Sequence, residues 1–240
     1  MSKQLVYKEQ IEFSQDDFVG GNINSYAIFK AFTHMATKHA ELLGVGFADM
    51  VAKKLLWVTM RVKYQILGKI LPNHTYIIKT FPQAKNLLEF DRDFLLQDGL
   101  GNVLIKGTSK WCVIDSSTRR IARMQNVDVP CAEHEPVFAD KFLKTAVFVP
   151  QTAPDYSYKV VNSDIDYNGH MNNSVYAKIV FDALMLNDQQ IETFQLNFLR
   201  EAMLGDRLDI YLQQKPEGIY VIGKRCEAEN SFSAFIKLKN

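Results

Sequence analysis

The chain has 240 residues, of which 47% are hydrophobic, so it can bury a substantial core as one large domain or two small ones. Its 28 lysines and arginines nearly balance 27 aspartates and glutamates, and a formal net charge of +1 gives no global sign of a nucleic acid or membrane partner. Three widely spaced cysteines, Cys112, Cys131 and Cys226, form neither a disulfide framework nor a zinc pattern. We therefore expect no cofactor and no metal.

The N-terminal residues lack the apolar run of a signal peptide. No apolar stretch approaches the roughly 18 residues that a membrane helix needs. Scattered cysteines in odd number also suit a reducing compartment. These observations predict a cytoplasmic protein.

The first quarter of the chain predicts a strand and then a long buried helix. Residues 5–13 alternate weakly, and a glycine-rich turn at 19–25 follows them. Apolar residues then recur at helical spacing until Gly44, a natural helix end. His34 and His39 lie on this helix, but their spacing of five is wrong for paired metal ligands, which sit three or four residues apart.

Strands should follow the helix, because the apolar period changes to two at Leu55. The expected strands are 55–66, 75–82, 88–97 and 103–114, with a hairpin turn at Asp98–Asn102. A proline-containing stretch without periodicity then predicts a linker. The order afterwards repeats, and the expected elements are a strand at 156–163, a polar turn, a helix at 173–186 and strands at 191–200, 207–214, 219–228 and 232–239.

The repetition is also visible in the residues themselves, since Gly21–Ser25 aligns with Gly169–Asn173 ahead of the two helices. We expect two similar α+β halves, residues 1–128 and 151–240, joined by a linker at 129–150. A long helix wrapped by an antiparallel sheet is the natural packing for each half. Asn22 occupies the position that His170 has in the second half, so only the second half carries a complete catalytic set.

The polar turn of the second half holds a carboxylate, an amide and an imidazole within five residues: Asp166, Asn168 and His170. A helix begins just after it, and its first amides lack internal partners and carry the positive end of the helix dipole. A carbonyl oxygen placed there could be polarised, which favours chemistry at a carbonyl. The same residue types also form ordinary turns and helix caps, so spacing alone leaves a structural role open.

Residues 164–176, DIDYNGHMNNSVY, strongly resemble the active-site motif of the acyl-ACP (acyl carrier protein) thioesterases. The stretches LLWV at 55–58, KWCVID at 110–115 and TRRI at 118–121 resemble segments of the same family's first half, and the match spans about residues 3–240. The resemblance implies an α+β protein of two tandem hotdog folds with the active site in the second. It also implies hydrolysis of fatty acyl-ACP to free fatty acid and carrier protein. Plant members carry a transit peptide and this chain shows none, so we expect a bacterial member.

Carried over by position, the family's DxNxH motif falls on Asp166, Asn168 and His170, and its later glutamate falls on Glu201. The family places a cysteine after that glutamate, whereas this chain has Ala202, which excludes a thiol nucleophile there. We expect Glu201 and His170 to position and deprotonate water, while Asn168 and the helix amides polarise the thioester carbonyl. Asp166 would orient His170 or Asn168. Direct attack by a carboxylate through an anhydride is the alternative mechanism.

Three other functions are alternatives. An acyl-CoA thioesterase would use the same chemistry, whereas a hotdog dehydratase or hydratase would use a His and a carboxylate at a different spacing. A non-enzymatic acyl-binding sensor would have no use for the four polar residues, which argues against it. The resemblance implies an acidic carrier protein as partner, which would need local positive charge. The candidate residues are Arg119, Arg120, Arg123, Lys106 and Lys110. We expect the first half to hold the acyl tail, no contact with nucleic acid or membrane, and either a monomer or a homodimer.

Overall fold

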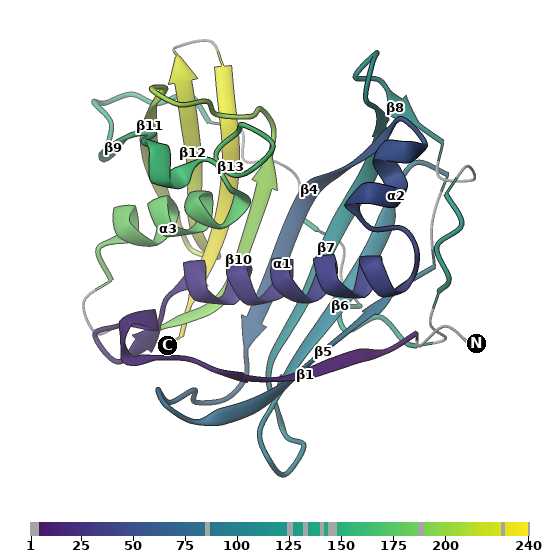
Figure 1. Ribbon diagram of the computed structural model, residues 1–240. Helices are drawn as coiled ribbons and strands as arrows, with labels where there is room; N and C mark the ends of the chain where they lie inside the picture. Colours follow the sequence, from purple (N-terminus) through teal and green to yellow (C-terminus); the bar gives the residue numbers. More distant parts are fainter. Residues whose placement is uncertain are drawn as a thin grey trace. The chain divides into compact units, whose positions relative to one another are not determined.

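The computed structural model describes residues 5–84, 87–123, 127–131, 134–139, 142–143, 148–186, 190–226 and 229–239. The chain divides into two compact units (Figure 1). Unit 1 comprises Met1–Phe13 and Ala31–Lys141, and unit 2 comprises Ser14–Lys30 and Phe142–Asn240. The predicted boundaries at residues 128 and 151 remain a prediction.

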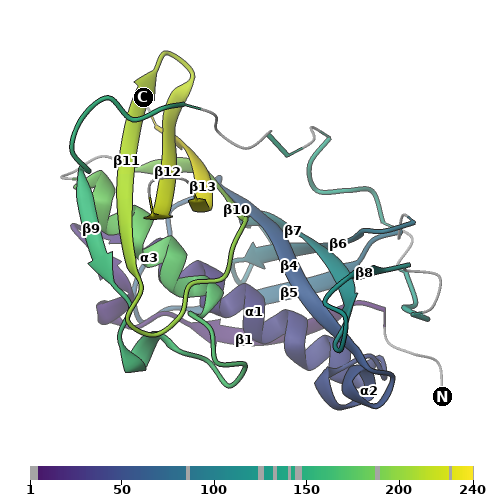
Figure 2. The ribbon, with the colours of Figure 1, turned by 90° about the horizontal axis from the view of Figure 1, so that it is seen from above.

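Unit 1 is an antiparallel sheet with a long helix on one side, as Figure 2 shows from above. The sheet order is β1–β5–β6–β7–β4, and β8 pairs with β7. The strands are β1 (Tyr7–Glu12), β4 (Leu55–Ile66), β5 (Thr75–Pro82), β6 (Phe90–Gln97), β7 (Val103–Asp115) and β8 (Ile121–Ala122). The long helix is α1 (Ser25–Leu42), whose first six residues group with unit 2. The four strands predicted between 55 and 114 are confirmed to within two residues.

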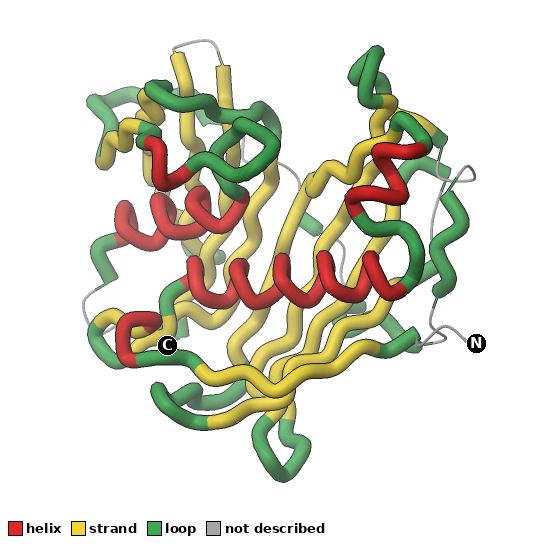
Figure 3. The backbone as a smooth tube through the Cα atoms, in the orientation of Figure 1, coloured by secondary structure: helices red, strands yellow, loops and turns green. Residues whose placement is uncertain are grey.

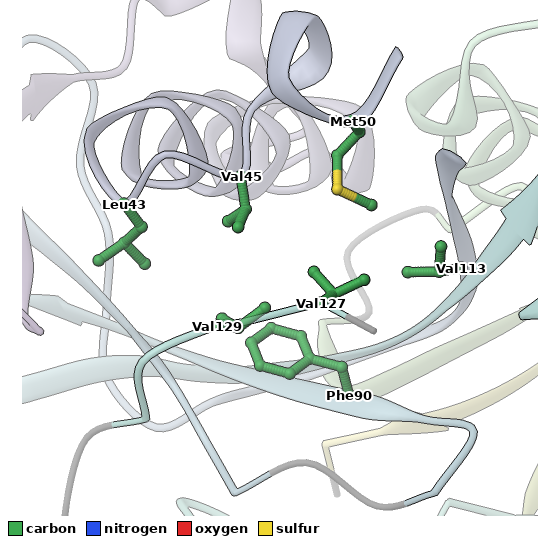
Figure 4. Close-up of a cluster of buried hydrophobic side chains, with 7 residues drawn as sticks. All are labelled: Leu43, Val45, Met50, Phe90, Val113, Val127 and Val129. Atoms are coloured by element: carbon green, nitrogen blue, oxygen red, sulfur yellow. The ribbon is translucent and has the colours of Figure 1, made fainter. Parts of the chain in front are cut away.

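The helix α1 ends where the sequence predicts, and a short helix follows it. Gly44 adopts a φ of 74°, a left-handed conformation that favours glycine. The short helix is α2 (Phe47–Ala52), which the sequence analysis missed because six residues are too few to establish a helical period. Its Met50 packs into a buried apolar cluster at this end of unit 1 (Figure 4). The cluster consists of Leu43, Val45, Met50, Phe90, Val113, Val127 and Val129.

A charged side chain, that of Arg92, is buried inside unit 1 together with its hydrogen-bond partners. The Arg92 guanidinium on β6 is only 3% exposed, and its Nη1 lies 2.9 Å from Nδ1 of the fully buried His39 and 3.3 Å from Oγ1 of Thr80. Burial lowers the pKa of Arg92 to about 10, so the group is charged at neutral pH. Because arginine can only donate hydrogen bonds, Nδ1 of His39 must be the acceptor and carries no proton.

The other face of the unit 1 sheet is covered in part by residues of the expected linker. The backbone N–H of Val137 donates to the buried Asp93 carboxylate at 3.0 Å. The Phe138 ring lies under two ammonium groups, with Nζ of Lys63 at 4.4 Å and Nζ of Lys106 at 4.5 Å from its centroid. Burial raises the pKa of Asp93, although hydrogen bonds from its neighbours oppose that rise.

Unit 2 repeats the antiparallel plan with a shorter helix. Its sheet order is β10–β13–β12–β11–β9, with a separate two-stranded sheet of β2 and β3. The strands are β2 (Phe18–Val19), β3 (Asn22–Ile23), β9 (Tyr156–Lys159), β10 (Ile191–Phe198), β11 (Arg207–Lys215), β12 (Gly218–Cys226) and β13 (Glu229–Leu238). The helix is α3 (Asn173–Leu184), and short 3₁₀ helices span Gln15–Asp17 and Asn162–Asp164.

Three local expectations for unit 2 were wrong in detail. The strand expected over 156–163 ends at Lys159 and gives way to a 3₁₀ helix. The helix expected over 173–186 ends at Leu184, where Met185 takes a left-handed φ of 46°. The glycine-rich stretch expected at 19–25 contains a small hairpin. Strands β2 and β3 pair through two residues each, and the turn between them consists of Gly20 and Gly21, which both take positive φ.

No helix in the described part of the chain is both long enough and apolar enough to cross a bilayer. Among the same residues, no group of three or more His, Cys, Asp or Glu side chains could hold a metal ion.

Candidate active site

The polar turn between β9 and α3 is closed by its own backbone. Ile165 and Met171 form an isolated antiparallel bridge, and the Asp166 N–H donates to the His170 carbonyl at 2.9 Å. Gly169 adopts a φ of 84° and donates its N–H to the Asp166 carbonyl at 3.0 Å. The Asn168-Gly169 dipeptide thus supplies the left-handed residue that a loop this tight requires.

A buried carboxylate that was not assigned a role from the sequence, Asp164, holds the base of this turn. It accepts hydrogen bonds from the Tyr158 hydroxyl at 2.9 and 3.0 Å and from the Val161 N–H at 2.8 Å. Its own carbonyl accepts the Asn172 N–H at 2.8 Å. Burial, together with the hydrogen bond to Asp164, raises the pKa of Tyr158 to about 12. Asp164 therefore joins the strand side of the turn to the helix side.

Asn172 is the N-cap of α3. Its Oδ1 accepts from the Ser174 N–H at 2.9 Å and the Ser174 hydroxyl at 2.7 Å, and its carbonyl accepts the Val175 N–H at 2.9 Å. The expectation that the first helix amides are all available to a substrate is therefore wrong for Ser174 and Val175. Within the described residues, the amide of Asn173 makes no hydrogen bond, so it alone of these three can meet a ligand oxygen.

Asp166 and Asn168 are brought together through the backbone. The Asp166 Oδ1 accepts the Asn168 N–H at 2.8 Å, which is an Asx turn. This contact fits the expected orienting role of Asp166 toward Asn168. Asn168 itself is exposed at the tip of the turn, with its amide side chain open to solvent.

His170 and Glu201 form the second pair of the site. Nε2 of His170 lies 3.2 Å from Oε2 of Glu201, and the side chains are 26% and 45% exposed. Glu201 lies on the loop that follows β10, and Figure 3 shows this loop and the polar turn together near the N-terminal end of α3. The Met171 N–H donates to the Ala202 carbonyl at 2.8 Å and so joins the two loops directly.

The site thus combines two carboxylates, an amide and an imidazole in one unit, and all four predicted residues lie on the two joined loops. A carboxylate next to an imidazole can accept a proton from water. Ala202 is completely buried and carries no thiol, so no cysteine follows Glu201 in the loop. The arrangement supports hydrolysis at a polarised carbonyl rather than thiol catalysis.

Two solved structures that are similar to this one over their full length are named as acyl-ACP thioesterases. An acyl-ACP thioesterase from Bacteroides thetaiotaomicron superimposes with a TM-score of 0.89 at 22% identity, and the alignment covers 100% of both chains. The 12:0-ACP thioesterase from Umbellularia californica gives a TM-score of 0.83 at 19% identity over 98% of this chain and 98% of that one. The predicted α+β architecture of two tandem hotdog folds is therefore confirmed.

Sequence comparison identifies the family. The sequence model of the acyl-ACP thioesterase N-terminal domain matches residues 4–129, and that of the C-terminal domain matches residues 150–235. The chain belongs to the acyl-ACP thioesterase family. A curated relative, oleoyl-acyl carrier protein thioesterase 1 of Arabidopsis thaliana, is 25% identical over 230 residues, which are 85% of this chain. The chain spans 63% of the length of that relative.

Proposed function

We propose that this protein hydrolyses the thioester of fatty acyl-ACP to a free fatty acid and the carrier protein. The observation that carries the proposal is the contact of 3.2 Å between His170 and Glu201 beside the N-terminus of α3. Hydrolysis needs an activated water, a site for the oxyanion and a path for the proton. The family to which the chain belongs supports the thioester as the bond that is broken.

In the proposed mechanism, a water held by Glu201 and His170 attacks the carbonyl carbon, and its proton passes to this pair. The Asn168 side chain and the Asn173 amide stabilise the negative charge that develops on the carbonyl oxygen. The carbon–sulfur bond then breaks, and the pair returns the proton to the leaving thiolate. Direct attack by the Glu201 carboxylate on the thioester through an anhydride is the alternative mechanism.

The acidic carrier protein would dock on positive charge in unit 1. Arg119, Arg120 and Arg123 are exposed, and the turn that holds the first two is rigid because Asp115 accepts three hydrogen bonds from residues 117 and 118. Lys110 is a poor candidate, since its Nζ contacts Glu89 at 2.8 Å and Asp91 at 2.9 Å. Lys106, which lies over the Phe138 ring, is also engaged.

Docking can be tested by reversing Arg119 and Arg120 to Glu. The KM for acyl-ACP should rise and lose part of its salt dependence, because long-range attraction to an acidic partner is screened by salt. Small acyl thioesters should be hydrolysed as before. An equal loss with both substrates would assign the two arginines a structural role.

The acyl tail would be held by the buried face of α1 in unit 1. Ala31 and Ala36 are buried there, next to Phe32, whose ring stacks on Phe94 at 4.3 Å. Larger residues at Ala31 or Ala36 should shift the preference toward shorter acids, since each methylene is worth up to about 0.8 kcal/mol of binding. An unchanged length profile in folded variants would place the tail elsewhere.

A direct assay separates hydrolysis of acyl-ACP from the competing functions. Free thiol release should be measured from acyl-ACP and acyl-CoA that carry the same fatty acid. We expect release from acyl-ACP at the higher kcat/KM. Preference for acyl-CoA would indicate an acyl-CoA thioesterase, and binding without release from either substrate would indicate a sensor.

A further inference from the structure

Glu201 lies on an exposed loop, so something other than the sheet must hold its carboxylate beside His170. The β10 strand ends at Phe198, and the loop continues to Arg207, where β11 begins. Leu199, Arg200, Met203 and Leu204 of this loop are exposed, whereas Ala202 is fully buried. Catalytic groups must be held within about 0.5 Å of the productive geometry, which a free loop does not provide.

The Tyr176 hydroxyl on α3 binds the two peptide groups on either side of Glu201. It accepts the N–H of Ala202 at 2.9 Å and donates to the carbonyl of Arg200 at 3.5 Å. The Ala202 N–H belongs to the peptide group after Glu201, and the Arg200 carbonyl belongs to the one before it. One side-chain oxygen therefore fixes the backbone on both sides of the Glu201 Cα atom.

The Tyr176 ring is itself held firmly. It is 3% exposed and makes edge contacts with Phe198 at 5.4 Å and Phe232 at 5.5 Å between ring centroids. Burial raises the pKa of Tyr176, although hydrogen bonds with Ser231 and Ala202 oppose that rise. The phenol therefore stays neutral at physiological pH and can both donate and accept a hydrogen bond.

Ser231 on β13 supports the same segment from the sheet. Its hydroxyl donates to the Arg200 carbonyl at 2.8 Å, and its carbonyl accepts the N–H groups of Leu199 and Arg200, each at 2.9 Å. The Arg200 side chain lies away from the site, with Nε 3.2 Å from Oε1 of Glu229. Ser231 holds only the peptide before Glu201, so Tyr176 is the side chain that reaches both.

We propose that Tyr176 is a positioning residue that holds Glu201 at the distance from His170 that water activation requires. The inference rests on the proposed function, in which Glu201 and His170 act as a pair. Tyr176 does not touch the reacting atoms in this account. It acts through the Glu201 backbone, so its effect should appear in kcat rather than in KM, and it should vanish when the Glu201 carboxylate is absent.

The test is Tyr176→Phe, which removes one oxygen and keeps the ring. We expect kcat on acyl-ACP to fall by about tenfold or more, with KM nearly unchanged, because hydrolysis depends on the geometry of the base. Tyr220→Phe is the matched control. It removes a hydroxyl that binds Glu217 at 3.0 Å, on a tyrosine whose ring packs on Phe235, and it should leave kcat unchanged.

The decisive comparison repeats Tyr176→Phe in a Glu201→Gln background. If the hydroxyl acts through the carboxylate, the second substitution should lower the residual rate by less than twofold. A full tenfold loss in that background, or a folded Tyr176→Phe protein with normal kcat, would overturn the positioning role. Normal activity of Glu201→Gln alone would instead overturn the proposed function.

Ser231→Ala provides a second variant in case Tyr176→Phe does not fold. It removes the hydroxyl that binds the Arg200 carbonyl and Tyr176, and it keeps every backbone contact of the loop. We expect a loss of kcat in the same direction but smaller, about two- to fivefold, and again no further loss in the Glu201→Gln background. A normal kcat for Ser231→Ala, with its unfolding midpoint lowered, would contradict the account of the loop.

Discussion

His39 in unit 1 and His170 in unit 2 both lie next to a charged side chain, yet their surroundings are opposite. His39 is fully buried, and its Nδ1 accepts a hydrogen bond from the Arg92 guanidinium. His170 is 26% exposed, and its Nε2 faces the Glu201 carboxylate at 3.2 Å. The two imidazoles therefore differ both in exposure and in the charge of the side chain beside them.

In the proposed mechanism, this contrast separates a structural imidazole from a catalytic one. The imidazole of unit 1 is buried and binds the Arg92 guanidinium, so we expect it to serve stability. The imidazole of unit 2 is partly exposed and lies beside a carboxylate, so we propose that it acts on water together with Glu201. Both long helices are capped by an asparagine through Oδ1, which accepts the Ala27 N–H in Asn24 and the Ser174 N–H in Asn172.

The largest effect should come from His170→Ala. Loss of this imidazole should lower kcat on acyl-ACP by on the order of a hundredfold or more. The unfolding midpoint should change little, because the side chain is partly exposed and lies on a loop. Thiol release measures kcat, and thermal unfolding of the same preparation measures the midpoint. A His170→Ala protein that loses stability but keeps its turnover would contradict the contrast between His39 and His170.

His39→Ala should show the reverse pattern. It leaves the Arg92 guanidinium with one acceptor fewer and a cavity beside it, which should cost about 2–3 kcal/mol of unfolding free energy. The kcat on short substrates should stay within about twofold of wild type at temperatures where the variant is folded. Chemical denaturation measures the loss of stability. A stable His39→Ala protein without turnover would assign chemistry to unit 1.

Arg92→Met tests whether the loss of stability in His39→Ala comes from the buried charge that is left behind. It replaces the buried charge by an apolar side chain of similar length, and such replacements are often close to neutral. We expect a smaller loss of stability than for His39→Ala. A larger loss would mean that the guanidinium makes a net stabilising contribution of its own.

A smaller, pH-dependent effect should come from Glu9, also in unit 1. A hydrogen bond from Tyr7, with further ones from Lys38 and His34, lowers the pKa of Glu9 from its usual 4.5 to about 2 against the opposing effect of burial. The stability that Glu9 contributes is therefore present above pH 4.5 and is lost as the pH falls toward 2. Glu9→Gln should flatten the decline of unfolding free energy in that window.

The matched control for Glu9 is Glu12→Gln, on the exposed face of the same strand β1. Its unfolding free energy should follow the wild-type curve between pH 4.5 and pH 2. Identical curves for all three proteins would show that the contacts of Glu9 contribute nothing measurable.

The smallest expected effect belongs to the cysteines. Cys112 is buried, and burial raises the pKa of its thiol, so it is a poor nucleophile. A Cys112→Ala, Cys131→Ala, Cys226→Ala protein should keep kcat within about twofold of wild type, provided that thermal unfolding shows it to be folded. Stoichiometric loss of activity on alkylation of the wild-type chain at one cysteine would contradict catalysis by water.

The strands of eight or more residues and the helices α1 and α3 could be predicted because their apolar residues recur over many positions. The β2–β3 hairpin and α2 could not be, since two to six residues carry no measurable period. Arg92 illustrates another limit. Its neighbours in the sequence are charged, so the pattern gives no sign that its side chain lies in the core.

Asp166, Asn168 and His170 are visible in the sequence as a polar turn before a helix, and the resemblance to a family motif adds Glu201. What surrounds these candidate site residues required coordinates. Asn172, Asn173 and Ser174 are equally good caps by composition, and only the structure shows that Asn172 occupies the Ser174 and Val175 amides. Tyr176 stands in the motif, yet its contact with Ala202 joins residues 26 positions apart. Side chains that act on distant backbone leave no local pattern to detect.

The central claim is that Glu201 and His170 act as one unit on a thioester. It is tested most directly by the kcat of thiol release from acyl-ACP for Glu201→Ala, His170→Ala and the double variant. We predict that each single substitution lowers kcat by on the order of a hundredfold or more, and that the double variant is within about tenfold of the slower single one. Near-normal turnover by both single variants, or losses that multiply in the double variant, would contradict the claim.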